Sequence, residues 1–185
     1  MTIVNENFDG IIIGFSRPKN TFLPILAWII MFFDKAKYSH VYIKWYSKKH
    51  EEWVHYEADT SGVRFVGSKA FDSQRKKVME YALPPMKDKH KLIKFALRNA
   101  GSEYPMWHLI GIAWAVIVKK ICGKDIPNIF SNEESICSKL TVIVLEIIGY
   151  DIRYTDKKLN KATPADVEKL VKAIVTRGMG GKYVL

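Results

Sequence analysis

A series of strand-like segments in the first half of the chain constrains the fold more than any other part of the sequence. "YSHVYIKWYS" and "EEWVHYEAD" are rich in β-branched and aromatic residues, and the "KKH" between them suits a hairpin turn. Similar segments lie on either side of this pair. The predicted strands cover residues 10–16, 38–47, 51–59, 62–66 and 76–83.

Helical patterns precede and follow the run of strands. The predicted helices cover residues 22–33, 87–101, 105–123, 136–149 and 163–178. The last has the strongest boundary signals: a Thr163 cap, Pro164 at the first helical position, Asp166 three residues after the cap, and Gly178 to close it. One strand and helix, then several strands, then helices is the order typical of an α+β fold. Because no repeat or linker-like segment divides the sequence, we expect a single domain over residues 1–185.

The charge balance bears on the partners that the chain can bind. Lysine and arginine number 29 against 19 acidic residues, which gives a formal net charge of +10. Such a surface favours anionic partners, among them an anionic membrane surface. No run of basic residues reaches five and no recognition motif is present, so we expect no specific nucleic-acid partner.

Three strongly apolar stretches raise the question of membrane insertion. Residues 22–33, 106–118 and 140–148 each fall short of the roughly 18–20 residues that a spanning helix needs. We interpret them as buried helices, with a lipid-facing edge as the alternative. "MTIVNENFDG" lacks the features of a signal peptide, and two cysteines are too few for a disulfide scaffold. We therefore expect a cytoplasmic protein, with association at a membrane as the alternative.

Cys137 is the first candidate catalytic residue, because it directly precedes an apolar helical run. If the helix starts at Ser135 or Ile136, Cys137 lies in the first turn, where the helix dipole favours a thiolate. "SNEE" (131–134) matches a capping box and predicts an earlier start, which would leave Cys137 little influenced by the dipole. No Cys/His pair has zinc-ligand spacing, so no metal site is expected. Cys122 has no matching motif, and we interpret it as a packing residue.

His40 is the histidine best placed to activate a thiol. In "SHVYIKW" it shares a strand face with Tyr42 and Lys44, opposite the more apolar face of Val41 and Ile43. On the next strand, His55 and Glu57 also share one face by the two-residue period. Either could hold the His40 ring in the correct tautomer, which is the third role of a catalytic triad.

These pieces, in this order, resemble the circularly permuted papain-like cysteine hydrolases of the NlpC-type superfamily, the YiiX and YebB group, with lecithin–retinol acyltransferase more distant. The matching segments are "YSHVYI", "WVHYEADTSGVRFV", "AGSEYPMW", "ICSKLTVIVLEIIG" and "ATPADVEKL". The resemblance places the catalytic base at His40, the acidic residue at Glu57 and the nucleophile at Cys137. Lys139 departs from the pattern, since an acid is common after "CS". The acyltransferase relatives use a second histidine near His55, which leaves Glu57 and His55 as alternatives for the third position.

The resemblance implies a permuted papain-like fold, in which an antiparallel sheet packs against helices and the nucleophile helix comes late in the chain. It implies attack of a Cys137 thiolate on a carbonyl, with the backbone N–H of Cys137 binding the developing oxyanion. Tyr104 or Ser39 could supply a second donor. No metal or organic cofactor is required.

The same resemblance gives three alternatives for function. The first is a peptidase or amidase that acts on cell-wall-type peptides. The second is a lipid-directed thiol hydrolase or acyltransferase, for which the apolar helices that carry Trp28, Trp107 and Trp114 could line an acyl groove. The third is a binding module that has lost turnover. The partner is thus expected to be a peptide or an acyl-containing substrate.

Overall fold

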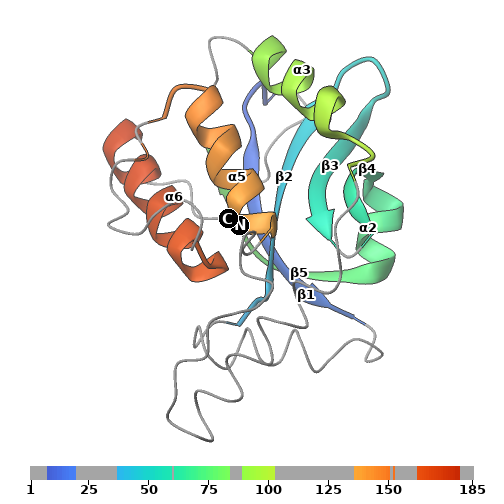
Figure 1. The fold of residues 1–185 in the computed structure, drawn as a ribbon, viewed down its shortest axis with the longest axis horizontal. Coiled ribbons are helices and arrows are strands. Elements are labelled where there is room, and N and C mark those ends of the chain that lie inside the picture. The colour runs from blue at the N-terminus through green and yellow to red at the C-terminus, as the bar shows by residue number, and fades with distance from the viewer. Residues whose placement is uncertain are drawn as a thin grey trace, which may run out of the picture.

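Five strands form one sheet in which every neighbouring pair is antiparallel (Figure 1). The structure, a computed structural model, describes residues 8–19, 37–59, 61–83, 89–102, 136–150, 152 and 162–179. The strands are β1 (Ile12–Pro18), β2 (His40–Ser47), β3 (Glu52–Asp59), β4 (Gly62–Gly67) and β5 (Arg75–Ala82). Their order in the sheet is β4-β3-β2-β1-β5, which puts β4 and β5 at its two edges.

The central hairpin of β2 and β3 sets the register around the predicted base. It is closed by residues 48–51, and Ser47 pairs with Glu52 at the start of the ladder. Glu51 takes the left-handed conformation that ends the turn, with φ 52°. β1 then pairs with β2 so that Ser16 lies opposite His40. Each of the five predicted strands is confirmed to within two residues at either end.

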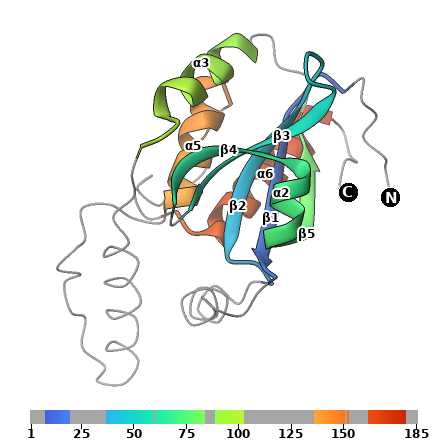
Figure 2. The same cartoon turned by 90° about the vertical axis from the view of Figure 1, so that its right-hand side faces the viewer.

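Four helices are described: α2 (Ser68–Gln74), α3 (Lys89–Asn99), α5 (Ile136–Ile147) and α6 (Pro164–Met179). Figures 1 and 2 show α5 and α6 on one face of the sheet and α2 against the other. Together with the antiparallel sheet they confirm the predicted α+β class. None of the described helices combines the length and the apolar character that crossing a bilayer would require.

The two faces of β2 enter different clusters, as its alternating pattern predicts. Val41, Ile43 and Trp45 belong to the main core, which α5 and α6 cover. Tyr42 points to the opposite face and packs with Phe71 of α2, at 4.5 Å between ring centroids. Burial of an aliphatic side chain such as Val41 or Ile43 stabilises the fold by about 1.5–3 kcal/mol. Packing in the main core therefore holds α5 on the sheet.

Sequence-encoded caps fix the ends of both covering helices. At the start of α6, the Thr163 backbone N–H donates to Oδ2 of Asp166 at 3.1 Å, and the Asp166 N–H donates to the Thr163 hydroxyl oxygen at 3.3 Å. This is the predicted capping box with an aspartate. At the end of α5, Gly149 adopts φ 91°, and the Tyr150 N–H donates to the Leu145 carbonyl at 3.0 Å. That bond belongs to a Schellman motif, which requires a residue that tolerates positive φ.

Some features differ from the sequence prediction. Helix α2 was not expected, because it is only seven residues long and buries only Phe71. Gly178 does not close the last helix as predicted, since α6 continues to Met179. Helix ends commonly vary by one or two residues. The predicted helices at 22–33 and 105–123 lie outside the described residues.

Candidate active site

Glu57 and His40 form the centre of the site, on neighbouring strands. The Nε2 atom of His40 lies 2.8 Å from Oε2 of Glu57, and both side chains are almost completely buried, at 6% and 1% exposed. An ionised carboxylate only accepts hydrogen bonds, so Nε2 carries the proton and donates it to Glu57. The other ring nitrogen, Nδ1, is thereby left as the acceptor in the neutral ring.

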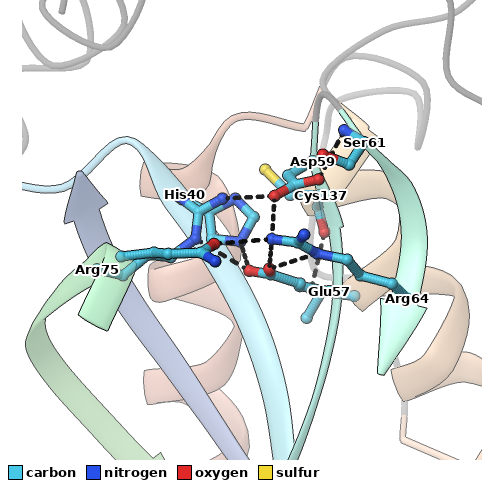
Figure 3. Close-up of polar contacts among 9 residues, drawn as sticks. His40, Glu57, Asp59, Ser61, Arg64, Arg75 and Cys137 are labelled. Carbon is cyan, nitrogen blue, oxygen red and sulfur yellow. Dashed lines mark hydrogen bonds and ion pairs between the residues drawn. The ribbon is translucent and has the colours of Figure 1, made fainter. Parts of the chain in front are cut away.

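Cys137, which comes late in the sequence, lies beside this ring. Helix α5, described over Ile136–Ile147, packs against β2 and β3, and Cys137 near its first described residue meets His40 and Val41 at the start of β2. A hydrogen bond links the Cys137 thiol to the imidazole of His40, and Figure 3 shows the sulfur beside the ring. Because Nε2 is taken by Glu57, this contact belongs to Nδ1. Cys137 as a residue is of intermediate exposure.

The surroundings of Cys137 favour the thiolate. Burial by itself raises the pKa of the thiol, whereas the hydrogen bond to His40 and the charge of its ring lower it. The Val41 backbone N–H and the Ser138 hydroxyl donate to the sulfur as well, and the pKa falls from about 9 to about 7.

Alkylation of Cys137 is therefore expected to follow an ionisation near pH 7. The rate with iodoacetamide, measured by peptide mass mapping from pH 5 to pH 10, should reach half its plateau at about pH 7. The pKa of the folded thiol lies below its ordinary value, so the rate falls only as the pH drops below that midpoint. In urea-unfolded protein the midpoint should return to about 9. A midpoint of 9 or above in the folded protein would contradict an activated thiol.

Glu57 belongs to a cluster of two arginines and two carboxylates. Arg64 donates to Oε1 of Glu57 from Nε at 3.2 Å and from its terminal nitrogen at 2.9 Å. The Nε atom of Arg75 lies 3.0 Å from Oε2 of Glu57. Both guanidinium groups also donate to Oδ2 of Asp59, at 2.7 and 3.1 Å. We call Glu57, Asp59, Arg64 and Arg75 the arginine–carboxylate cluster.

This cluster joins the two edges of the sheet. Arg64 comes from β4 and Arg75 from β5, which are the first and last strands in the sheet order. Figure 3 shows the two side chains reaching Glu57 from opposite sides. Burial of Glu57 would raise the pKa of its carboxyl, but His40, Arg75 and Arg64 more than compensate and hold that pKa far below its usual range. Glu57 is therefore ionised throughout the neutral range.

His55, the alternative to Glu57, lies away from the His40 ring. It is fully buried and stacks on Phe71 of α2, with ring centroids 4.2 Å apart and an interplanar angle of 11°. Neither ring nitrogen has a hydrogen-bond partner in the structure. Burial, with Lys77 and Lys44 nearby, lowers the pKa of His55 to about 4. His55 is thus a neutral packing residue, and of the two candidates only Glu57 contacts His40.

The remaining predicted site residues divide between described and undescribed parts of the chain. Ser39 is buried next to His40, and its backbone N–H donates to the Ser16 carbonyl at 3.1 Å. Tyr104 lies outside the described residues, as do Cys122 and the "SNEE" segment. The structure describes α5 from Ile136, and because residues 131–135 lie outside the described part of the chain, neither of the two predicted helix starts is tested.

Sequence reasoning missed the arginine–carboxylate cluster apart from Glu57. Arg64 alternates with apolar residues in "GVRFV", and this pattern could have placed it on the Glu57 side of the sheet. Arg75 follows a helix that was itself unpredicted, so no comparable pattern marks it in the sequence. Within the described residues no group of three or more His, Cys, Asp or Glu side chains could hold a metal ion.

Comparisons of the chain with protein-family models, with curated proteins and with solved structures found no match.

Proposed function

We propose that this chain is a cysteine hydrolase that cleaves an amide or ester bond through a thioester on Cys137. The observation that carries the proposal is the continuous series of contacts from the Cys137 thiol through the His40 ring to the Glu57 carboxylate. A thiol with a pKa near 7, an imidazole whose second nitrogen can accept the thiol proton and an ionised acid fit the three roles of nucleophile, base and orienting group.

The proposed reaction proceeds in two halves. Nδ1 of His40 accepts the thiol proton, and the sulfur attacks the substrate carbonyl to form a C–S bond. The backbone N–H of Cys137 binds the oxyanion, a contact whose loss typically costs about 3 kcal/mol of barrier. The imidazolium then gives its proton to the departing amine or alcohol, which leaves an acyl-Cys137 thioester. A water molecule, deprotonated by His40, attacks this thioester, and the acid and the free thiol are released.

The arrangement supports a permuted papain-like architecture as part of the proposal. The base lies on an early strand and the nucleophile on a late helix, which is the order of the NlpC-type group that the sequence resembles. That resemblance favours a peptidase or amidase, so a cell-wall-type peptide is the first substrate class to test. The apolar segments on which the lipid-directed alternative depends lie outside the described residues.

The proposal predicts an acyl group on one cysteine. Protein is mixed with p-nitrophenyl acetate or with soluble cell-wall peptide fragments, quenched in acid within seconds, and analysed by intact mass and peptide mapping. We expect one acyl group on Cys137, none on Cys122, and steady release of product. The Cys122→Ser variant is the matched control and should behave as the wild type. Product released equally by wild type and Cys137→Ala, with no acyl-cysteine, would refute the proposal.

A further inference from the structure

The Glu57 oxygen that faces His40 also contacts an arginine. Oε2 accepts the His40 Nε2–H at 2.8 Å and lies 3.0 Å from Nε of Arg75. Two atoms that contact one oxygen at these distances lie within about 6 Å of each other, the range in which one charge shifts the pKa of another. Arg75 is only 13% exposed, so solvent screens this interaction weakly.

The cluster as a whole carries no net charge. Arg64 and Arg75 balance Glu57 and Asp59, and all four side chains are joined by contacts of 2.7 to 3.2 Å. A carboxylate alone behind an imidazole strongly favours the imidazolium. Behind His40 that attraction is reduced, because the nearest guanidinium repels the same proton.

Building on the proposed function, we propose that Arg75 is a positioning residue of this site: it fixes the Glu57 oxygen that orients His40, and its charge limits how firmly the imidazole holds a proton. The charges acting on the ring are consistent with this role. Burial lowers the pKa of His40 most, and Arg75 lowers it further. The hydrogen bonds to Cys137 and Glu57 and the charge of Cys137 raise this pKa, and the net shift is upward.

This balance matters because His40 must both take and return a proton. An imidazole that binds the thiol proton too weakly leaves Cys137 as an unreactive thiol. One that binds it too firmly forms the thiolate readily but is a poor acid toward the leaving group. Arg75 keeps the imidazole from binding the proton too firmly, and Glu57 keeps it from binding the proton too weakly.

Other charged groups on the neighbouring elements are paired with one another and are not among the main causes of the pKa shift of His40. On β5, Lys77 forms an ion pair with Asp72 at 2.8 Å. On α6, Glu168 accepts from Tyr81 at 2.9 Å and pairs with Lys172 at 2.7 Å. On α5, the nearest titratable group is Cys137 itself. The groups that face His40 directly are thus Cys137 and Glu57, with Arg75, Arg64 and Asp59 behind them.

The test is the pH dependence of Cys137 alkylation in Arg75→Met, read together with turnover. Removing the guanidinium strengthens proton binding by His40, so the thiolate should form at lower pH. We expect the alkylation midpoint to move from about 7 to about 6, which gives about tenfold faster labelling at pH 5. Turnover of the substrate should fall at the same time, because the imidazolium releases its proton less readily. A merely structural loss would slow both processes.

Two controls accompany this variant. Arg75→Lys keeps the charge and should keep the midpoint within a few tenths of a unit of the wild type. Lys76→Met removes the same charge from the neighbouring, exposed position and should leave the midpoint unchanged. A midpoint in Arg75→Met that equals that of Lys76→Met, or that moves to higher pH, overturns the proposal.

The outcome remains decisive if Arg75→Met does not fold. Arg64→Met removes the guanidinium from the other Glu57 oxygen, at a position that is 30% exposed. It should shift the midpoint in the same direction by a smaller amount, and no shift there also overturns the proposal. These readouts need no turnover. A wild type that is alkylated near pH 7 but never acylated would refute the proposed hydrolase and leave the role of Arg75 to be decided by the midpoints.

Discussion

In the His40→Ala variant, alkylation of Cys137 at pH 6 is expected to be about 100-fold slower than in the wild type. With a pKa of about 7, close to a tenth of the thiol is ionised at that pH. Without the ring, the pKa returns to at least its ordinary value of about 9, and burial holds it there or higher. Turnover should fall further, on the order of 10³-fold or more, because the base and the acid of the reaction are lost together.

The matched control for this prediction is His90→Ala. His90 is an exposed histidine on α3, so its removal should leave both alkylation and turnover unchanged. Because His40 is buried, His40→Gln is measured beside His40→Ala, and circular dichroism establishes that each variant is folded. Undiminished labelling of Cys137 in folded His40→Ala or His40→Gln protein would show that the imidazole does not activate the thiol.

The second large effect is expected at Glu57, where Glu57→Gln should reduce both activity and stability. All contacts of the carboxylate come from donors, so an amide must turn its NH₂ group toward either Arg64 or the Arg75–His40 pair. If it faces His40, Nε2 becomes an acceptor and Nδ1 carries the proton, a tautomer that cannot accept from the thiol. Turnover is expected to fall by about 10²–10⁴-fold, as when the orienting acid of a triad is replaced.

The stability change should be about 3 kcal/mol in urea unfolding at pH 7, because two arginines lose a buried partner. Glu146→Gln removes an exposed carboxylate from α5 and should change stability by less than about 0.5 kcal/mol. The pKa of Glu57 is depressed in the folded protein, so its contribution is complete above about pH 4.5 and is lost as the pH falls below that value. The difference in free energy of unfolding between wild type and Glu57→Gln should therefore decrease in acid. If this difference is absent at pH 7, the cluster does not stabilise the fold.

The strands and the ends of the late helices could be predicted because their signals are local. Alternation in β2 separates Tyr42 from Val41 and Ile43, and the structure places these residues in different clusters on opposite faces of the sheet. Thr163 and Asp166 specify the start of α6 through bonds within one turn. Local signals of this kind need no knowledge of the tertiary fold.

The sequence could nominate Cys137 and His40, but it could not show which charges gather behind them. Choosing between His55 and Glu57 needed the direction of side chains relative to α2, a helix too short to leave a pattern. The convergence of Arg64 and Arg75 depends on two edge strands that approach one carboxylate, and no periodicity along the chain encodes such a meeting. Contacts between distant segments are set by curvature and packing, which composition does not report.

Docking of α5 on the start of β2 determines at which stage of folding Cys137 becomes reactive. A ribosome makes the imidazole almost a hundred residues before the sulfur, so the newly emerged cysteine is an ordinary, sluggish thiol. The thiol is activated only when α5 packs against β2 and the His40 ring contacts the sulfur. The Cys137 sulfur therefore becomes strongly nucleophilic only after the early strands and the late helix have folded together.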